Sequence, residues 1–315
     1  MRVAVLDDYQ NAALTFAPWD QLGGVQITTF TEHLATDDAV ADALADFEIV
    51  VAMRERTPFT RDRLNRLPKL RLLVTTGMGN ASIDLQSCSA NDVVVAGTGF
   101  TPVATVELTW GLILAAMRRI CDEHTAVRER RWQHTIGPHL DGLTLGVIGL
   151  GNVGSRVAKI GQAFGMTVVA WSQNLDPTHA AELGVEATTK DELLKSSDVV
   201  TIHLRLSERT VGIIGSAELQ SMKSTAFLVN TSRGPIVDEE ALLAVLGAGQ
   251  IAGAGVDVYD SEPLPVDHPL RSAPRVVTTP HLGYVSTQSF EQFYGDAVED
   301  IAAFMRGAPV RVLNA

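Results

Sequence analysis

The chain has 315 residues and a formal net charge of −12, since 25 Lys and Arg residues face 37 Asp and Glu residues. At roughly 100–200 residues per domain, this length favours two domains, and the acidic balance argues against a protein held on nucleic-acid phosphates or anionic lipid. The most apolar stretch, residues 108–117, is about half as long as a membrane-spanning helix, and the first residues turn acidic at Asp7. Neither a transmembrane helix nor a signal peptide is predicted, and we expect a cytoplasmic protein.

Short β-branched runs alternate with helical patterns in residues 1–100. This alternation is typical of parallel α/β sheets that helices cover on both faces. Amphipathic helices are expected at 36–45 and 60–67. The expected strands of this first block are 2–7, 25–30, 48–52, 70–75 and 93–96.

A long apolar segment, residues 103–120, precedes a second series of strands. Six strands are expected, and they predict a second parallel sheet. A polar helical pattern at 286–305 closes the chain, and we expect it to pack on the first block because it cannot form a domain alone. The expected strands of the second block are 143–148, 167–171, 199–203, 226–230, 255–259 and 275–279.

A glycine-rich turn follows the strand at 143–148 and opens a helical pattern at 153–164. In such a GxGxxG turn, the first glycine permits a tight bend, the second lets the backbone approach a pyrophosphate, and the third allows close helix–strand packing. The alternative is a turn that only packs tightly. The context favours a dinucleotide site, made by Gly149, Gly151, Asn152, Val153 and Gly154.

The acid that usually follows the second strand of such a site is missing. NAD-specific proteins place a carboxylate there, which binds the ribose 2′-hydroxyl and repels a 2′-phosphate. Here Ser172, Gln173 and Asn174 occupy the region. Arg205, which follows Leu204 after another strand, could pair with a 2′-phosphate, or it could be an exposed loop residue. The sequence therefore predicts NAD or NADP as the cofactor and slightly favours NADP.

Three polar side chains, Arg233, Glu262 and His281, follow three strands of the second sheet. Strand ends converge in a parallel sheet, on the edge that carries the glycine turn. A guanidinium can hold a carboxylate at two points, an imidazole can exchange a proton near neutral pH, and a carboxylate beside it would favour the imidazolium. Each could instead have a structural role, but together they indicate a hydride-transfer site.

The chain resembles the D-isomer-specific 2-hydroxyacid dehydrogenase family over nearly its whole length. The segments that carry the resemblance are VNTSRGPIVD (229–238), GVDVYDSEP (255–263) and TPHLG (279–283), with further likeness at 77–84, 105–107 and 198–210. The resemblance implies a discontinuous, flavodoxin-like substrate domain, residues 1–100 and 284–315. It also implies a Rossmann NAD(P)-binding domain, residues 101–283. Both are doubly wound α/β domains.

The resemblance also implies roles for single residues. Arg233, Glu262 and His281 match the family's catalytic residues, and Asp257 matches its nicotinamide contact. The backbone around Gly77, Met78 and Gly79 matches the loop that binds the substrate carboxylate. The positions that match residues near the cofactor are Thr105, Thr210, Thr231 and Ser232. The family further implies a homodimer built largely on the dinucleotide-binding domains.

Three positions depart from the family pattern. Arg205 often corresponds to a proline and Ser172 to an acid, which puts NAD preference in doubt, and Tyr284 replaces a smaller residue. Arg54 follows a first-block strand and could favour a substrate with a second anionic or polar group. The alternative is a solvated, ion-paired loop.

The sequence therefore predicts an oxidoreductase that transfers a hydride between NAD(P)H and a small 2-oxo acid or D-2-hydroxy acid. Glyoxylate and hydroxypyruvate are the first substrates to consider, whereas formate or phosphite would keep the enzyme class and change the substrate. A different class of protein is also open: a dinucleotide-sensing binding protein that resembles the family's corepressor branch. No metal is expected, because His134 and His139 lack further ligands in register.

Overall fold

The computed structural model describes residues 1–315 and contains two compact units. The first unit joins Met1–Thr101 to Val285–Ala315, and the second is Pro102–Tyr284. The expected boundaries lie one residue before these. The chain therefore leaves the first unit once and returns to it for its last helix.

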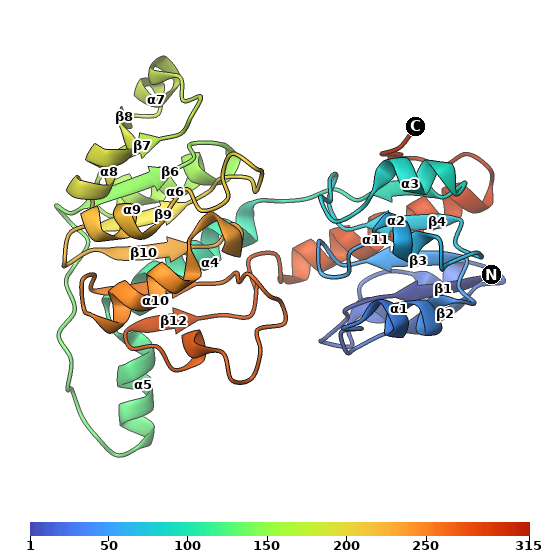
Figure 1. Ribbon diagram of the computed structural model, residues 1–315, viewed down its shortest axis with the longest axis horizontal. Coiled ribbons are helices and arrows are strands. Elements are labelled where there is room, and N and C mark those ends of the chain that lie inside the picture. Colours follow the sequence, from blue (N-terminus) through green and yellow to red (C-terminus); the bar gives the residue numbers. More distant parts are fainter. The chain divides into compact units, whose positions relative to one another are not determined.

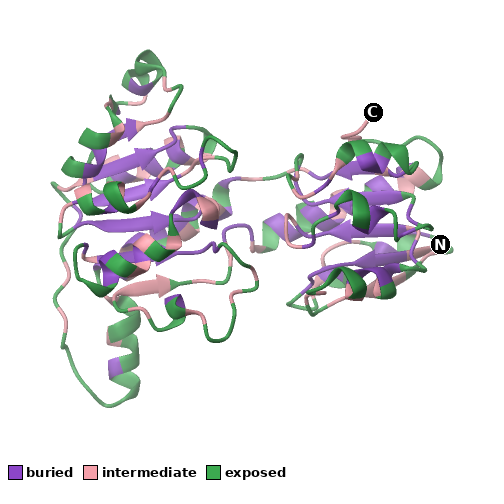
Figure 2. Cartoon of the chain, viewed as in Figure 1, coloured by how far each residue is buried: buried purple, intermediate pink, exposed green.

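The first unit is built on a five-stranded parallel sheet with strand order β2-β1-β3-β4-β5. This is the flavodoxin-like order that the sequence predicted. The central strands consist of buried residues throughout, as expected when helices cover both faces (Figure 2). The strands are β1 (Arg2–Val5), β2 (Gln26–Thr29), β3 (Ile49–Ala52), β4 (Leu72–Thr75) and β5 (Val94–Gly97).

Side-chain caps fix where the helices of this unit begin. Thr36, Thr60, Asp84 and Ser286 each accept a hydrogen bond from a backbone amide of the first helical turn. The helices are α1 (Asp37–Leu44), α2 (Arg61–Leu64), α3 (Leu85–Ala90) and α11 (Thr287–Met305), with 3-10 turns η1 (Ala13–Thr15) and η2 (Trp19–Gln21).

The last helix belongs to the first unit, where it lies against β4 (Figure 1). After it, the chain pairs with β5: the amide of Leu313 donates to the carbonyl of Val95 at 2.8 Å, and the amide of Gly97 donates to the carbonyl of Arg311 at 3.0 Å. The C-terminal segment thus covers an edge strand that would otherwise expose unpaired backbone groups.

The second unit contains a seven-stranded parallel sheet, with order β12-β11-β10-β9-β6-β7-β8. The order reverses at β6, as in a Rossmann fold, and the predicted α/β class with two doubly wound sheets is confirmed. The prediction of six strands was wrong by one, because β8 is too short to leave a pattern. The strands are β6 (Thr144–Ile148), β7 (Thr167–Trp171), β8 (Glu186–Ala187), β9 (Val199–Ile202), β10 (Phe227–Asn230), β11 (Gly253–Val256) and β12 (Val276–Thr278).

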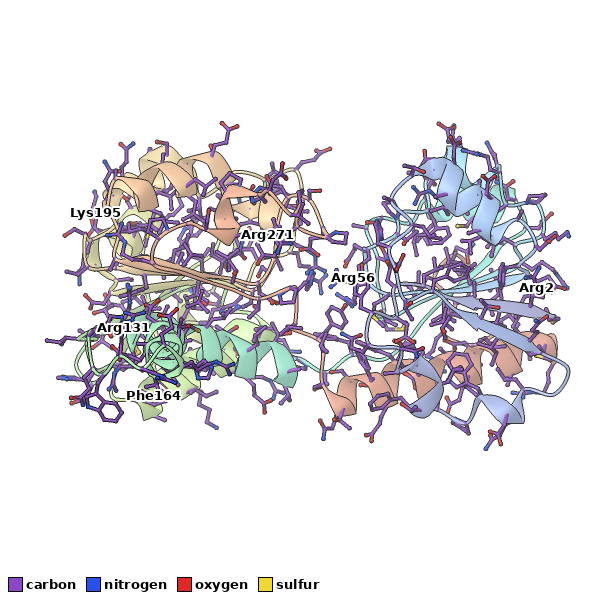
Figure 3. The ribbon with its side chains drawn as sticks, turned by 90° about the horizontal axis from the view of Figure 1, so that it is seen from below. Arg2, Arg56, Arg131, Phe164, Lys195 and Arg271 are labelled. Atoms are coloured by element: carbon purple, nitrogen blue, oxygen red, sulfur yellow. The ribbon has the colours of Figure 1, made fainter.

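The apolar segment at 103–120 is not one helix. The first helix, α4 (Val103–Met117), ends before Arg119, whose φ of 54° is left-handed, and α5 (Ile120–Arg128) follows. Trp110 of α4 lies against Phe164, which ends α6 (ring centroids 4.9 Å apart; Figure 3). The other helices are α6 (Asn152–Ala163), α7 (Pro177–Glu182), α8 (Lys190–Ser196), α9 (Ser216–Ser221) and α10 (Glu239–Gly247), with 3-10 turns η3 (Gly234–Ile236) and η4 (Pro269–Arg271).

No helix of the chain has the length and apolar character that crossing a membrane requires.

Candidate active site

The glycine turn joins β6 to α6, and its three glycines differ in what surrounds them. Gly149 has a φ of 99°, and a Cβ there would lie 2.7 Å from the carbonyl oxygen of His203. A Cβ at Gly154 would lie 2.0 Å from the carbonyl oxygen of Gly149, whereas Gly151 has nothing within 4 Å. At the first and third positions, the absence of a side chain allows the backbone to pack closely. At the second position, the space beside Gly151 is open.

That open space lies at the start of α6. Gly151 is the N-cap and provides no side-chain acceptor, and Asn152 and Val153 begin the helix. The unpaired amides and the positive end of the helix dipole suit a pyrophosphate. The residues present thus fit the phosphate-binding part of a dinucleotide site.

The loop after β7 carries Ser172, Gln173 and Asn174, and no carboxylate stands among them. Arg209, which the sequence analysis did not consider, contacts this loop: its Nη2 donates to Oε1 of Gln173, and Nε2 of Gln173 donates to the carbonyl of Arg209 at 3.2 Å. Arg205 is exposed and its side chain forms no hydrogen bond or ion pair with the loop, and Leu204 packs on the hydrophobic core.

His281 and Glu262 form a close hydrogen-bonded pair. Nδ1 of the imidazole lies 2.6 Å from Oε2 of Glu262, and both side chains are less than one fifth exposed. The other carboxylate oxygen accepts from the amide of Tyr259 at 3.0 Å. Because Glu262 contacts Nδ1, proton exchange with a substrate would pass through the other ring nitrogen of His281, Nε2.

The turn that carries His281 is held by Asp257. His281 has a left-handed φ of 53°. The Asp257 carboxylate accepts from the Thr279 hydroxyl at 2.6 Å, the Leu282 amide at 2.7 Å and the Gly283 amide at 2.9 Å. Burial raises the pKa of Asp257, although these three donors favour its ionised form. Asp257 therefore positions the histidine turn.

Threonines tie α4 to the same region. The Thr105 hydroxyl donates to the carbonyl of Gly283 at 2.7 Å, and the Thr109 and Thr231 hydroxyls lie 2.8 Å apart. Ser232 donates its hydroxyl to the carbonyl of Ile202, at the end of β9, at 2.8 Å. Thr105, Thr231 and Ser232 are three of the four hydroxyl residues that the resemblance placed near the cofactor. In the structure, each of them bonds to the end of a neighbouring element.

Arg233 lies in the loop between β10 and η3. Asn230 fixes this loop: its Nδ2 donates to the carbonyl of Arg233 at 3.0 Å, and its Oδ1 accepts from the amide of Ser232 at 3.0 Å. A Cβ at Gly234 would lie 2.1 Å from the backbone carbonyl carbon of Tyr259. Only glycine allows the arginine loop to pack this closely on the segment that leads to Glu262.

A second histidine of the unit, His203, has a different character. Its Nε2 lies 3.0 Å from the hydroxyl of Thr201. Desolvation lowers the pKa of His203 to about 3, so its ring is neutral at physiological pH. It cannot supply the proton that the reduction of a carbonyl needs.

In the first unit, the loop after β4 contains Gly77, Met78 and Gly79. Gly77 has a φ of 94°, and its amide donates to the Thr98 hydroxyl at 2.8 Å. Arg54 covers this loop, since a Cβ at Gly77 would lie 2.2 Å from its Nη1. The guanidinium is largely buried, donates to the carbonyl of Thr76 at 3.0 Å, and lies 3.8 Å from Glu55. Of the alternative, a solvated, ion-paired loop, the structure thus shows the ion pair but not the exposure to solvent.

A cluster that the sequence did not predict follows β1. The buried carboxylate of Asp7, at a φ of 55°, accepts from the Thr57 hydroxyl at 2.7 Å and lies 2.8 Å from Nδ1 of His33. Nearby, the Arg56 guanidinium lies 5.5 Å from the centre of the Tyr9 ring (Figure 3). These residues come from three separate loops, and no short sequence pattern links them.

No group of three or more His, Cys, Asp or Glu side chains is arranged to hold a metal ion.

Comparison with known proteins places this geometry in a family. A family model described as "D-isomer specific 2-hydroxyacid dehydrogenase, NAD binding domain" matches residues 110–283. A glyoxylate reductase from Aeropyrum pernix is 39% identical over 264 residues, which cover 80% of this chain and 79% of that protein.

Two solved structures cover nearly the whole chain. A phosphoglycerate oxidoreductase from Vibrio cholerae is 38% identical with a TM-score of 0.93, and the match covers 98% of this chain and 100% of that one. The D-lactate dehydrogenase of Aquifex aeolicus, solved with NAD and lactic acid, is 27% identical with a TM-score of 0.80, over 97% and 96% of the two chains. These relatives are enzymes, which gives no support to the dinucleotide-sensing alternative. The chain belongs to the D-isomer-specific 2-hydroxyacid dehydrogenase family.

Proposed function

We propose that this protein reduces a small 2-oxo acid to the D-2-hydroxy acid, and catalyses the reverse oxidation, with a nicotinamide dinucleotide. The observation that carries the proposal is the hydrogen-bonded pair of His281 and Glu262, on the sheet that also carries the glycine turn and Arg233. In this assignment the second unit takes the cofactor and the first takes the substrate. When bound, the cofactor supplies or accepts the hydride.

The protein's own residues handle the proton and the carboxylate. His281 donates a proton from Nε2 to the carbonyl oxygen of the 2-oxo acid and takes it back from the hydroxyl in the oxidation. Glu262 stabilises the imidazolium and fixes the ring through Nδ1. Arg233 binds the substrate carboxylate through the fork of its guanidinium. In the first unit, the backbone of Gly77–Gly79 is the candidate substrate loop.

Substrate choice rests on the first unit. Arg54 lies on the Gly77 loop and favours an oxo acid with a polar or anionic group on its third carbon. Hydroxypyruvate fits this preference, and glyoxylate is the substrate named for the Aeropyrum relative. We propose these two as the first substrates, ahead of pyruvate and phenylpyruvate.

Cofactor choice rests on the loop after β7. We propose that the enzyme accepts NADP(H) as well as NAD(H) and prefers NADP(H), because no carboxylate is present to repel a 2′-phosphate. We further propose a homodimer formed by the second units. The exposed apolar side chains of α5 and of the segment that follows it support this assembly.

The test is the absorbance decay of NADH and of NADPH, measured in parallel after adding each of the four oxo acids to purified protein. Turnover is expected with glyoxylate or hydroxypyruvate, and faster with NADPH. Tight cofactor binding without turnover of any oxo acid would refute the proposed reaction.

A further inference from the structure

Gln173 and Arg209 connect the loops that follow β7 and β9. In the sheet, β6 lies between these two strands, so their loops flank the glycine turn. Two hydrogen bonds join them: the Arg209 guanidinium donates to the Gln173 side chain, and the Gln173 amide donates to the backbone carbonyl of Arg209. A guanidinium is therefore held where NAD-specific Rossmann proteins carry a carboxylate.

The neighbouring residue Thr210 fixes the backbone around Arg209 through hydrogen bonds within the loop. This threonine is buried, its hydroxyl donates to the carbonyl of Arg205 at 2.7 Å, and it accepts from the amide of Ser207 at 2.8 Å. The loop thus folds back on itself and presents Arg209 to the end of β7. Fixing the backbone in this way removes part of the conformational entropy that binding a ligand would otherwise cost.

The charge of Arg209 is not neutralised by any carboxylate. Its partner Gln173 is neutral, and Arg209 forms no ion pair. A guanidinium has five donors in a planar fork that matches a phosphate, and the bond to Gln173 uses one of them. Arg205, by contrast, has no contact that would direct it toward Ser172–Asn174.

We propose that Arg209, oriented by Gln173, binds the 2′-phosphate of NADP(H) and thereby sets the cofactor preference of the enzyme. The inference rests on the proposed function for the identity of the ligand. It replaces Arg205 by Arg209 as the residue that recognises the phosphate. The hydroxyl of Ser172 and the amide of Asn174 are neutral and admit either cofactor.

The experiment measures dissociation constants by calorimetry for ADP-ribose and for 2′-phospho-ADP-ribose. Neither ligand carries a nicotinamide, so the result does not depend on turnover. The wild type is expected to bind the phosphorylated ligand about tenfold or more tightly. Arg209→Ala should raise the dissociation constant of the phosphorylated ligand by about 10- to 100-fold, the range of a charge-assisted hydrogen bond. The dissociation constant of ADP-ribose should change less than about twofold.

Two further variants sharpen the test. Gln173→Glu keeps the shape of the side chain but pairs Arg209 with a carboxylate, so it should remove the preference for the phosphorylated ligand and spare ADP-ribose. Arg306→Ala removes the same charge from an exposed site of the first unit and should leave both constants unchanged.

Three outcomes would overturn the inference: no preference in the wild type, equal weakening of both ligands by Arg209→Ala, or a selective loss in Arg205→Ala in place of Arg209→Ala. The proposed function fails separately. A protein that shows the Arg209-dependent preference but reduces no oxo acid would keep this inference and lose the reaction.

Discussion

At the scale of single residues, the proton step depends on how the structure holds one imidazole. His281 has a left-handed backbone and three supports: Glu262 on its Nδ1, and the two amides after it on Asp257. Glu262 acts on the orientation of the ring, and Asp257 holds the backbone turn that carries it. Loss of the imidazole should therefore affect catalysis alone.

We expect His281→Ala to lower kcat for oxo-acid reduction by about 10²- to 10⁴-fold, the contribution of a general acid. The dissociation constant for NADPH should change less than about twofold, because the proposed phosphate contacts, the glycine turn and Arg209, are left intact. Glu262→Gln should lower kcat by less, since the amide oxygen still accepts from Nδ1 but carries no charge. Steady-state kinetics and a fluorescence titration of NADPH measure both quantities.

A second His–Glu pair in the same unit provides the control. Nε2 of His268 lies 2.9 Å from Oε1 of Glu239, with exposures close to those of the catalytic pair. His268→Ala should keep kcat within about twofold. A matching loss of kcat in both alanine variants would mean that His281 acts through the stability of the unit and not on the proton.

Arg233 leads to a different expectation, because we propose that it binds the substrate carboxylate. Arg233→Lys keeps the charge but loses the two-point fork. We expect kcat/KM for the oxo acid to fall by about 10- to 100-fold, with most of the change in KM and an unchanged KM for NADPH. Arg306→Lys is the matched control, and kinetics of Arg233→Lys equal to those of the wild type would remove Arg233 from this role.

At the scale of elements, the sequence predicted the strands well and their ends less well. Buried β-branched runs such as Ile49–Ala52 have few alternatives to a central strand. The expected strands extended to His203 and Tyr259, whereas the structure ends them at Ile202 and Val256. Apolar residues such as Val258 and Tyr259 follow the last paired residue of β11, Val256, so periodicity alone cannot locate a strand end.

Some contacts of the candidate site could be predicted from the sequence, and others could not. The contact between Glu262 and His281 could be anticipated, because parallel strand ends must converge. The contact between Gln173 and Arg209 could not, because it depends on how two loops fold back. Asp7 was also beyond prediction: its network with His33 and Thr57 requires a left-handed backbone that no pattern indicates.

One buried carboxylate in α11 makes the stability of the first unit depend on pH. Oδ1 of Asp300 accepts from Nε of Arg311 at 2.9 Å, while Oδ2 has no hydrogen-bond partner. Burial raises the pKa of Asp300 to about 7, and Arg311 opposes this only in part. The folded state thus holds a proton that the unfolded state releases near pH 4.

The direction of the pH dependence follows from this difference. Because the folded pKa is the higher one, the stabilisation is complete below about pH 4 and is lost as the pH rises through about 7. The free energy of unfolding should fall across this window by at most about 4 kcal/mol. Asp300→Asn should remove the decline, and apparent Tm values at pH 5 and pH 8 measure it.

Asp42→Asn is the matched control, since Asp42 is an exposed carboxylate of the same unit. It should keep the wild-type decline. If Asp300→Asn loses as much Tm between pH 5 and pH 8 as the wild type, the dependence has another origin.

At the scale of the whole molecule, the second unit exposes several large apolar side chains within one short stretch of the chain. They lie on α5 and the segment after it, where Val127 is 55% exposed, Trp132 is 77% exposed and Ile136 is fully exposed. Figure 2 shows this region as largely exposed. We propose that these side chains contribute to an interface, and two copies related by a twofold axis would bury them on both partners at once.

We therefore expect the wild type to have twice the chain mass of 33.8 kDa in solution. Ile136→Asp places a charge in the middle of the apolar segment, where burial without a partner costs several kcal/mol, and should shift the mass to that of one chain at micromolar concentration. Val266→Asp is the matched control, because Val266 is 91% exposed in a loop of the same unit and should leave the mass unchanged. Light scattering after size-exclusion chromatography measures all three proteins, and a single-chain mass for the wild type would refute the dimer.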